Sequence, residues 1–192
     1  DKQAILELQR EVQRLRQIHA TVDAHPSPFY AILLMDGDSL GSHMGNKDNQ
    51  RPISDALNAF TAAVPAVVER HNGLLIYAGG DDVLAVLPVE DALGCAAAVR
   101  ELYLKSFKAS KIPTTISAAI EFAHVKMPLG KVLGDAHKLL DDVAKDGAGR
   151  DAVAVRVWKT GRMTLQWAQP WEIALVGGKV QVQEIAQAFT DS

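Results

Sequence analysis

Apolar residues recur along the chain with several different periods, and the first stretch has the period of a helix. From Lys2 to His19 they lie at alternating steps of three and four, which predicts a helix with a narrow apolar seam. The seam consists of Ile5, Leu8, Val12 and Leu15. A helix of two heptads is marginal alone, so we expect it to pack on this domain or on a neighbour. The prolines of residues 25–28 then break the pattern and predict a linker.

The next segment has the pattern of a buried strand followed by a helix. Phe29 to Met35 is a continuous apolar run, which is typical of a central, well-covered strand. We expect a polar, glycine-containing loop as far as Arg51, and Ser54 is the expected N-cap of the following helix. Pro65 is expected to kink or interrupt that helix, and residues 71–73 to end it.

The middle of the chain predicts a hairpin, a helix and a strand. Strands at Leu74 to Ala78 and Asp82 to Leu87 flank the dipeptide Gly79-Gly80, which is typical of a hairpin turn. Residues 91–107 have helical spacing, and residues 115–124 alternate between an apolar set and a small or polar set. We expect helices to cover one face of the sheet and the small or polar face to stay open for a ligand.

The last third of the chain predicts an amphipathic helix, a hairpin and a short helix. The helix spans residues 129–145, the strands 153–158 and 163–167 surround Thr160-Gly161, and the short helix lies near 183–189. The order of elements from the first strand is strand, helix, strand, strand, helix, strand. This order predicts an α+β, ferredoxin-like (βαββαβ) fold with an extra N-terminal helix and a C-terminal hairpin and helix.

Composition is that of an ordinary globular protein. The 192 residues are 48% hydrophobic and 22% charged, which predicts one sizeable domain at 29–192 after a helix and linker at 1–28. The net charge of −3 gives no general sign of nucleic-acid binding, although it is compatible with a local basic patch. Cys95 is the single cysteine, which excludes an internal disulfide and a cysteine-rich zinc site.

No signal peptide is recognisable, and no apolar run approaches the ~18 residues that a membrane span needs. We therefore expect no membrane contact and, by default, a cytoplasmic location. The chain starts at Asp1 without a methionine, from which we expect a fragment of a longer protein.

The strongest chemical feature is the sequence Gly79-Gly80-Asp81-Asp82 at the tip of the predicted hairpin. The glycines can take a positive φ and leave the backbone open to a triphosphate. Adjacent strand residues point to opposite faces, so only an irregular turn lets Asp81 and Asp82 serve one site. Glycine and aspartate are also favoured at ordinary hairpin tips, so this motif alone leaves a purely structural role open.

A second acidic motif, Asp36-Gly37-Asp38, ends the first predicted strand. In a ferredoxin-like sheet this strand is a neighbour of the hairpin, so Asp36 would approach Asp81 and Asp82. Carboxylates so close repel one another unless a cation compensates them, and Mg²⁺ or Mn²⁺ prefers such oxygen ligands. Two metal ions ~3.5–4 Å apart could activate a 3′-hydroxyl and stabilise departing pyrophosphate. The alternative is that the aspartates merely terminate a strand.

Weaker candidates lie elsewhere in the chain. Lys145, at a helix C-terminus, could reach triphosphate oxygens, although lysines also favour this position for reasons of the helix dipole. Arg150 has the same ambiguity. Ser117 either lines the nucleotide pocket or is a tolerated polar residue on its strand. The three tryptophans could stack on bases, but packing against the core is the favoured interpretation.

Together these segments resemble the large, polymerase-like subunit of type III CRISPR effector complexes, especially of the III-B form. The resemblance covers Phe29 to Trp171. It runs through Asp36-Gly-Asp-Ser-Leu-Gly41, Tyr77-Ala-Gly-Gly-Asp-Asp-Val-Leu84, Ser117, His124 with Pro128-Leu129, Ala144-Lys145, and Trp158-Lys-Thr-Gly161 leading to Pro170-Trp171. The Gly-Gly-Asp-Asp turn alone is shared with unrelated polymerases, whereas the combination in this order is specific.

The resemblance implies a nucleotidyltransferase palm that converts ATP to cyclic oligoadenylates, which are second messengers in antiviral defence. Target RNA captured by the guide-RNA complex and its other subunits would switch the activity on. By position, Asp36, Asp81 and Asp82 would be ligands of a two-metal Mg²⁺ or Mn²⁺ site, with Asp81 and Asp82 catalytic. The residues expected at the nucleotide are Gly37, Asp38, Gly79, Gly80, Ser117 and Lys145.

The chain also departs from that family. Its members usually carry two palms with ATP between them, and often a nuclease domain with a His-Asp pair, which this sequence lacks. DNA cleavage is therefore not predicted, and synthesis requires a second palm or a second copy of the chain. Two alternatives stay open: a non-catalytic palm that binds nucleotide or scaffolds an assembly, and a homodimeric cyclic-dinucleotide synthase. Diguanylate cyclases share the palm plan but have Glu where Asp82 stands.

Overall fold

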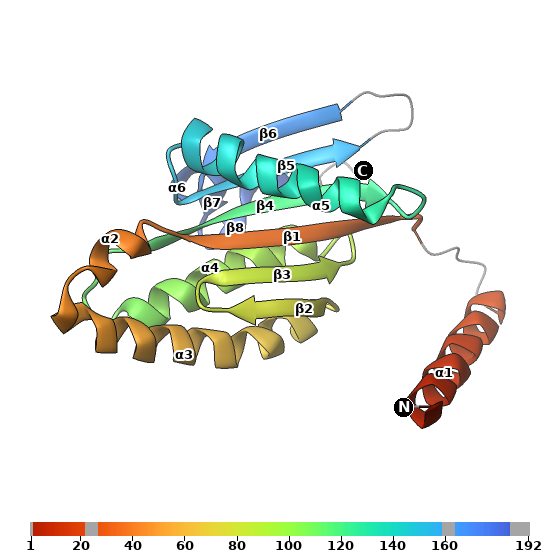
Figure 1. The fold of residues 1–192 in the computed structure, drawn as a ribbon. Helices are drawn as coiled ribbons and strands as arrows, with labels where there is room; N and C mark the ends of the chain where they lie inside the picture. Colours follow the sequence, from red (N-terminus) through yellow and green to blue (C-terminus); the bar gives the residue numbers. More distant parts are fainter. Residues whose placement is uncertain (1, 22–26, 159–163, 185–192) are drawn as a thin grey trace.

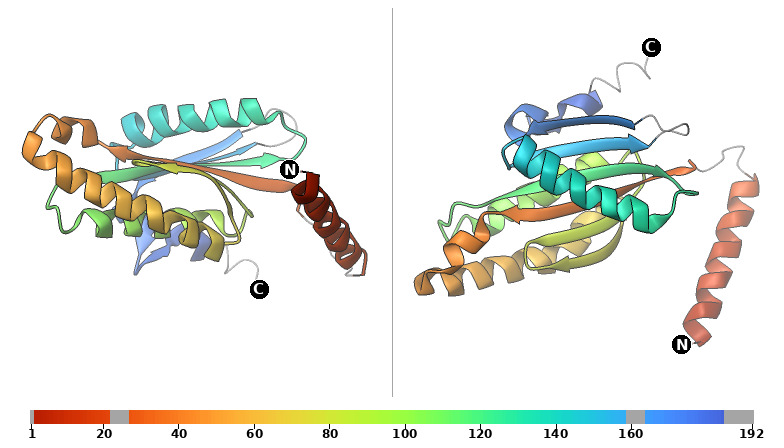
Figure 2. Two further views of the ribbon diagram at one scale, coloured as in Figure 1. Left: turned by 60° about the horizontal axis from the view of Figure 1, so that its bottom comes forward. Right: turned by 45° about the horizontal axis from the view of Figure 1, so that its top comes forward.

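The computed structural model of the chain describes residues 2–21, 27–158 and 164–184. Helix α1 (Lys2–Thr21) confirms the predicted N-terminal helix and extends away from the rest of the chain (Figure 1). The seam residues Ile5, Val12 and Leu15 are exposed, so the expected packing of the seam on this domain is not found for them. The reason is geometric, because α1 lies beside no other element in the views of Figures 1 and 2.

A six-stranded sheet in the order β2-β3-β1-β4-β5-β6 forms the centre of the domain. The strands are β1 (Phe29–Asp38), β2 (Leu74–Gly79), β3 (Asp82–Leu87), β4 (Thr115–His124), β5 (Ala152–Trp158) and β6 (Thr164–Pro170). Neighbouring strands are antiparallel except β4 and β5, which are parallel. The central strand β1 pairs with β4 along its whole length, from Phe29 opposite His124 to Asp38 opposite Thr115.

Helices separate the strands in the predicted order. They are α2 (Leu40–Met44), α3 (Lys47–Arg70), α4 (Ala92–Phe107), α5 (Leu129–Lys138), the π-helical η1 (Leu139–Gly147) and α6 (Trp171–Ala174). A small hairpin of β7 (Leu175–Val176) and β8 (Lys179–Val180) follows α6. The order β1-α3-β2-β3-α4-β4 confirms the βαββαβ fold, and β5 and β6 confirm the C-terminal strand pair.

Helices cover both faces of the sheet, which corrects the expectation of one open face. α3 and α4 pack on one face, and α5 with η1 lies across β1, β4 and β5 on the other (Figures 1 and 2). The helical segment has an apolar side that must be buried, and small residues on the strands let it approach closely. The small residues are Ala119, Ala123, Ala152 and Ala154. The small and polar set of β4 is therefore covered, and Ser117 is fully buried.

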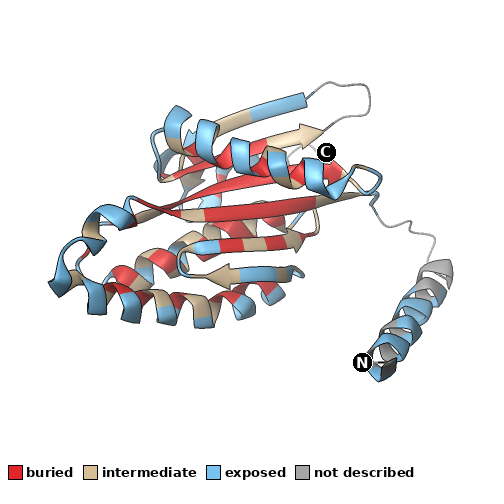
Figure 3. Cartoon of the chain, viewed as in Figure 1, coloured by how far each residue is buried: buried red, intermediate tan, exposed pale blue. Residues whose placement is uncertain are grey.

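One part of the second face stays uncovered, next to the edge strand β2. Figure 3 shows that β1 and β4 are almost entirely buried, whereas β2 is half-buried or exposed. Leu74, Ile76 and Tyr77 of β2 have 64%, 53% and 54% of their surface exposed. Large exposed apolar patches mark surfaces that meet other molecules.

The helix after β1 begins earlier than predicted. A loop was expected as far as Arg51 with Ser54 as the N-cap, but α3 begins at Lys47. Asn46 is the N-cap, and its side chain accepts a hydrogen bond from the N–H of Asp48 at 3.0 Å. Pro65 lies inside α3 on its exposed side and does not interrupt the helix, because its buried neighbours Val64 and Val68 hold the segment on the core.

The chain end is described only in part. The predicted turn at 160–161 lies outside the described residues, and of the predicted helix at 183–189 only residues up to 184 are described, as part of a helical turn at 181–184. In the part of the chain that is described, no helix is long and apolar enough to cross a membrane.

Glu121 gives the fold a testable pH dependence. The side chain is fully buried on β4, and its carboxylate oxygens accept no hydrogen bond from the residues that the structure describes. Arg156 Nη1 lies 3.9 Å from Glu121 Oε2. Burial raises the pKa of Glu121 to about 7 from 4.5, against the opposing charge of Arg156. The folded state thus retains a proton that the unfolded chain releases, so the stabilisation by protonated Glu121 is complete in acid and is lost as the pH rises to about 7.

We expect Glu121→Gln to remove this dependence. The difference in unfolding free energy between the variant and the parent, measured by urea denaturation from pH 5 to pH 8, should move in favour of the variant as the pH rises. Glu101→Gln on α4 is the matched control and should show no such trend. A difference that stays constant over this range would show that Glu121 is ionised in the folded state throughout.

Candidate metal and nucleotide site

The end of β1 and the tip of the β2–β3 hairpin bring three carboxylates together. Met35 pairs with Val83, so the next residue of β1, Asp36, lies beside the start of β3. One carboxylate oxygen from each of Asp36, Asp81 and Asp82 lies within 4.8 Å of the others. The structure therefore brings together all three residues that the sequence suggested as metal ligands, which we call the acidic triad.

The hairpin turn has the geometry that allows two adjacent aspartates to share one site. Gly79 pairs with Asp82, and Gly80 with Asp81 forms the tip. Gly80 has a φ of +64°, which favours glycine, and nothing lies within 4 Å of the position that a Cβ would take. The backbone at the tip is thus open to an approaching ligand. Thr61 of α3 steadies it by donating a hydrogen bond to the Gly80 carbonyl at 3.3 Å.

Gly37 is required at its position because the triad packs against it. A Cβ on Gly37 would clash with the Asp81 side chain and would lie 2.8 Å from the hydroxyl of Tyr103. Tyr103 is fully buried on α4, and its hydroxyl is hydrogen-bonded to Thr114 Oγ1 at 3.1 Å. From the sequence, Tyr103 was placed only within the predicted helix of residues 91–107. Its polar tip in that helix is the signal from which a role beside the site could have been found.

Burial, followed by mutual repulsion, dominates the electrostatics of the triad. Burial, followed by the proximity of Asp36 and Asp81, raises the pKa of Asp82 to about 6. The pKa of Asp81 is also raised, mainly by burial and further by Asp36, although a backbone hydrogen bond and Lys145 act in the opposite direction. Three carboxylates with one neighbouring lysine leave an excess of negative charge. A hard divalent cation such as Mg²⁺ or Mn²⁺ fits this all-oxygen set of donors.

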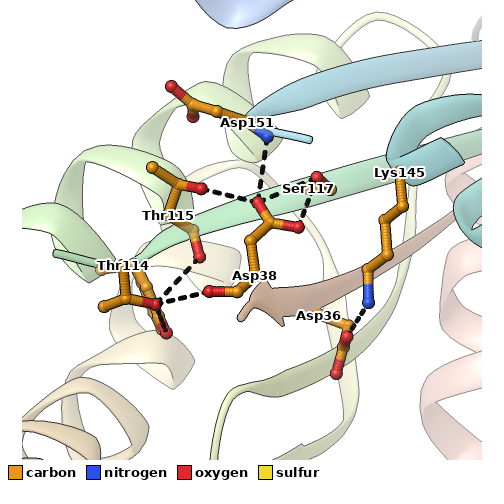
Figure 4. Close-up of polar contacts among 8 residues, drawn as sticks. Asp36, Asp38, Thr114, Thr115, Ser117, Lys145 and Asp151 are labelled. Atoms are coloured by element: carbon orange, nitrogen blue, oxygen red, sulfur yellow. Dashed lines mark hydrogen bonds and ion pairs between the residues drawn. The ribbon is translucent and has the colours of Figure 1, made fainter. Parts of the chain in front are cut away.

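Lys145 reaches the triad from the sheet face that α5 and η1 cover. It lies near the end of η1, and its Nζ contacts Asp36 Oδ2 (Figure 4). The side chain is largely buried, with 15% of its surface exposed. Lys145 is the cation expected at the nucleotide phosphates, and the structure brings it to the edge of the triad.

Asp38 and Ser117 do not join the triad. Asp38 is 3% exposed and turns away from Asp36 toward β4 and the start of β5 (Figure 4). Its carboxylate accepts hydrogen bonds from Ser117 Oγ at 2.9 Å, Thr115 Oγ1 at 2.8 Å and the N–H of Asp151 at 3.0 Å. Both residues were expected at the nucleotide, but their described contacts are with each other and with the protein interior.

A groove lies beside the turn on the side away from Lys145. It has a volume of ≈ 240 Å³ and runs between α2, α3 and the hairpin tip. Its lining residues are Met44, Gln50, Ile53, Ser54, Leu57, Asn58, Thr61 and Gly80. Apolar walls with a few polar groups are typical of sites for small organic ligands. Trp171, in contrast, is fully buried, which supports its interpretation as a packing residue.

Known proteins resemble this chain in sequence. Residues 29–154 match the family described as "Cas10/Cmr2, second palm domain". The CRISPR system Cmr subunit Cmr2 of Pyrococcus furiosus is 35% identical over 182 residues, and the match covers 79% of this chain. The chain spans 21% of the length of that relative.

Solved structures resemble the chain in fold. The Csm1–Csm4 cassette in complex with cA4 matches with a TM-score of 0.58 and 19% identity, over 76% of this chain and 24% of that chain. The guanylyl cyclase Cya2 matches with a TM-score of 0.52 and 13% identity, over 67% of this chain and 74% of that one. At these identities the likeness concerns the fold, and it confirms the palm expected from the sequence.

Metal binding to the triad should be measurable as thermal stabilisation. Millimolar Mn²⁺ should raise the unfolding temperature of the parent chain, because a ligand at 100 times its Kd stabilises by about 2.7 kcal/mol. Asp82→Asn should abolish this response. It should also raise the metal-free unfolding temperature at pH 8, by at most about 3 °C because Asp82 is largely exposed.

The sign of the second effect follows from the raised pKa of Asp82, whose ionised form destabilises the folded state above about pH 6. Near pH 4 the two metal-free proteins should therefore unfold at closer temperatures. Asp141→Asn on the exposed side of η1 is the matched control and should keep the Mn²⁺ response. An unchanged Mn²⁺ response in Asp82→Asn would rule out the triad as the metal site.

Proposed function

Since the chain belongs to the Cas10/Cmr2 second palm domain family, we propose that it is the catalytic palm of a type III CRISPR effector subunit that converts ATP to cyclic oligoadenylates. The family assignment makes residues 29–154 a cyclase- and polymerase-like palm. On this proposal the palm domain is the one expected at 29–192, after the expected helix and linker at 1–28. The observation that carries the proposed activity is the meeting of Asp36, Asp81 and Asp82 within 4.8 Å at an open glycine turn.

The acidic triad would hold two divalent cations, Mg²⁺ or Mn²⁺, through carboxylate oxygens. When bound, such ions would supply the Lewis acidity for attack by a 3′-hydroxyl and for the departure of pyrophosphate. The protein contributes the position of these ligands, since Asp36 lies on a strand that is paired on both sides and Asp81 is wedged against Gly37.

The remaining groups are suited to the nucleotide. The open tip at Gly80 would admit a triphosphate, whereas the Tyr77 ring packs against Gly79. Lys145 would neutralise phosphate charge from η1. The groove of ≈ 240 Å³ next to Gly80 could take the nucleoside, with Asn58 and Ser54 as its polar contacts. ATP as the substrate is supported by the family, because no described residue distinguishes adenine from guanine.

A second palm would complete the site from the uncovered part of the sheet. Leu74, Ile76 and Tyr77 are exposed on β2, the strand that leads into the turn of the triad. The chain spans 21% of the Pyrococcus relative, so a partner palm within the same longer protein is compatible with its size. Other subunits of a guide-RNA complex and a target RNA are the further partners that this proposal includes.

The same uncovered strand favours one alternative from a different class. A second copy of this chain could occupy it and form a homodimeric cyclic-dinucleotide synthase. A palm that only binds nucleotide or scaffolds the assembly would also keep the groove and the triad, but would not turn ATP over.

The direct test is product formation by the full-length protein in its assembled complex, with target RNA, ATP and Mg²⁺. We expect cyclic oligoadenylates from the parent. The double variant Asp81→Asn with Asp82→Asn should lose at least about a hundredfold in rate, because it removes two of three metal ligands. Asp141→Asn with Asp142→Asn on η1 carries the same change in charge and should stay active.

Mass spectrometry of products from ATP and from GTP separates the alternatives. A short cyclic product from GTP would favour the homodimeric synthase. ATP binding without turnover by the complete assembly would favour the scaffolding palm. Product formation that survives the double variant would contradict the assignment of Asp81 and Asp82.

The partner surface has its own test. We expect Ile76→Glu to leave the free energy of unfolding within about 0.5 kcal/mol of the parent, because Ile76 is 53% exposed. Product formation should fall at least about tenfold, because a charge is buried where the second palm docks. Leu165→Glu on the opposite edge strand, where 59% of the side chain is exposed, should keep the activity. Equal activity of the two variants would contradict docking on β2.

A further inference from the structure

Asp38 is placed to support the site from within the protein. It is buried, and three donors fill most of the acceptor capacity of its carboxylate: Ser117 Oγ, Thr115 Oγ1 and the N–H of Asp151. None of these described partners is a cation. A carboxylate so occupied has little left for a metal ion or a nucleotide, although its neighbour Asp36 lies in the triad.

The hydrogen bond from the N–H of Asp151 to Asp38 stabilises an unfavourable backbone conformation at residues 149–151. Gly149, Arg150 and Asp151 have φ values of +89°, +69° and +43°. A left-handed conformation is costly for the two residues that carry side chains, and it persists only where the surroundings impose it. We call residues 149–151 the left-handed turn.

Further contacts fix the last residue of this turn. Arg100 of α4 donates two hydrogen bonds of 2.7 Å to the Asp151 carboxylate, and the N–H of Trp171 donates one of 2.8 Å to its carbonyl. Together with the bond to Asp38, every polar group of Asp151 is engaged. The left-handed turn is therefore imposed by its neighbours rather than by its own sequence.

The left-handed turn is hydrogen-bonded to the backbone of Lys145, whose side chain is the cation of the site. The N–H of Arg150 donates to the carbonyl of Lys145 at 3.1 Å. The side chain of Lys145 contacts Asp36, which lies two residues before Asp38 on β1 (Figure 4). The segment from Lys145 to Asp151 is thus tied to the end of β1 at both of its ends.

We propose that Asp38 is a positioning residue for nucleotidyl transfer: its carboxylate holds the left-handed turn, and the turn sets Lys145 beside Asp36, where the triphosphate binds. The last step rests on the proposed function, because Lys145 meets a triphosphate only if the site binds ATP. The first step, that Asp38 holds the left-handed turn, is independent of it.

Two substitutions separate positioning from direct contact. Asp38→Ala removes every acceptor and should release the left-handed turn. Asp38→Asn keeps an acceptor oxygen for the N–H of Asp151, and its amide can donate to the hydroxyl of Ser117, which can also accept. A positioning residue should therefore be rescued by Asn, whereas a metal ligand should be as sensitive to Asn as Asp36 is.

The experiment uses the full-length protein in its assembled complex and begins with hydrogen exchange of residues 146–152. Asp38→Ala should speed amide exchange there by at least about tenfold, and Asp38→Asn should restore protection, because the released turn opens more often. Asp141→Ala on η1 is the control that should leave exchange unchanged. Parental protection in Asp38→Ala would overturn the proposal, whether or not the complex makes any product.

The second readout is the affinity for ATP with Mg²⁺, by equilibrium binding, together with KM and kcat. Asp38→Ala should weaken binding about tenfold, as Lys145→Ala does, and the double variant should be no weaker than Lys145→Ala alone, because the two act through one contact. Asp38→Asn should return the affinity to within about threefold of the parent. The loss should appear in KM more than in kcat.

The remaining outcomes of the binding and exchange experiments also support or overturn the proposal. Additive losses in the double variant, or a loss in Asp38→Asn equal to that in Asp36→Asn, would make Asp38 a direct ligand and overturn the proposal. If Asp38→Ala does not assemble, the comparison of Asp38→Asn with Asp36→Asn decides alone. A parent that makes no product while exchange follows the expected pattern would refute the proposed function and keep Asp38 as the residue that holds the turn.

Discussion

Repulsion among three carboxylates is the interaction on which the rest of this molecule depends. Asp36, Asp81 and Asp82 lie within 4.8 Å of one another, and burial with mutual charge raises the pKa of Asp82 to about 6. Such an arrangement weakens the folded state unless a cation compensates it. The chain nevertheless keeps it, at the end of its central strand and beside an open turn. A site that costs stability and is geometrically well defined is typical of function.

The fold supplies the rigidity that this repulsion requires. Strand β1 is paired on both sides and buried under helices on both faces, so Asp36 cannot move away from the hairpin. Gly37 lets Asp81 approach, and Thr61 of α3 holds the turn through the Gly80 carbonyl. On the other side, Asp38 and Arg100 hold the left-handed turn that follows Lys145. Lys145, the lysine that contacts Asp36, thus comes from a segment that is itself fixed to the same strand.

Local patterns predicted the parts of the fold that depend on local physics. Period-two and helical spacing gave the βαββαβ order, and the Gly-Gly dipeptide gave the hairpin, because glycine tolerates the positive φ at residue 80. The meeting of Asp36 with Asp81 and Asp82 followed from strand adjacency in that fold. The start of α3 was harder to predict, because Asn46 and Ser54 are both suitable N-caps and two prolines lie inside the helix.

Long-range packing explains the predictions that were wrong. The alternation of β4 suggested an open face, but Ala119 and Ala123 are small because α5 and η1 lie on them. That Asp38 meets the nucleotide stays a prediction, but its carboxylate is engaged inside the protein. Its direction is set by donors about 80 and 110 residues away, Thr115, Ser117 and the N–H of Asp151. No periodicity in the sequence encodes such distant partners. Arg150 and Asp151 are not glycines, so the sequence gives no signal of their left-handed φ values.

The measurement that tests the triad most directly is a crystal structure of the protein with ATP and Mn²⁺, using the anomalous signal of manganese. We expect Mn²⁺ peaks at Asp36, Asp81 and Asp82, with the triphosphate lying against Gly79 and Gly80 and Lys145 at its oxygens. Nucleotide bound without manganese at the triad, or with its phosphates on another surface, would contradict the account.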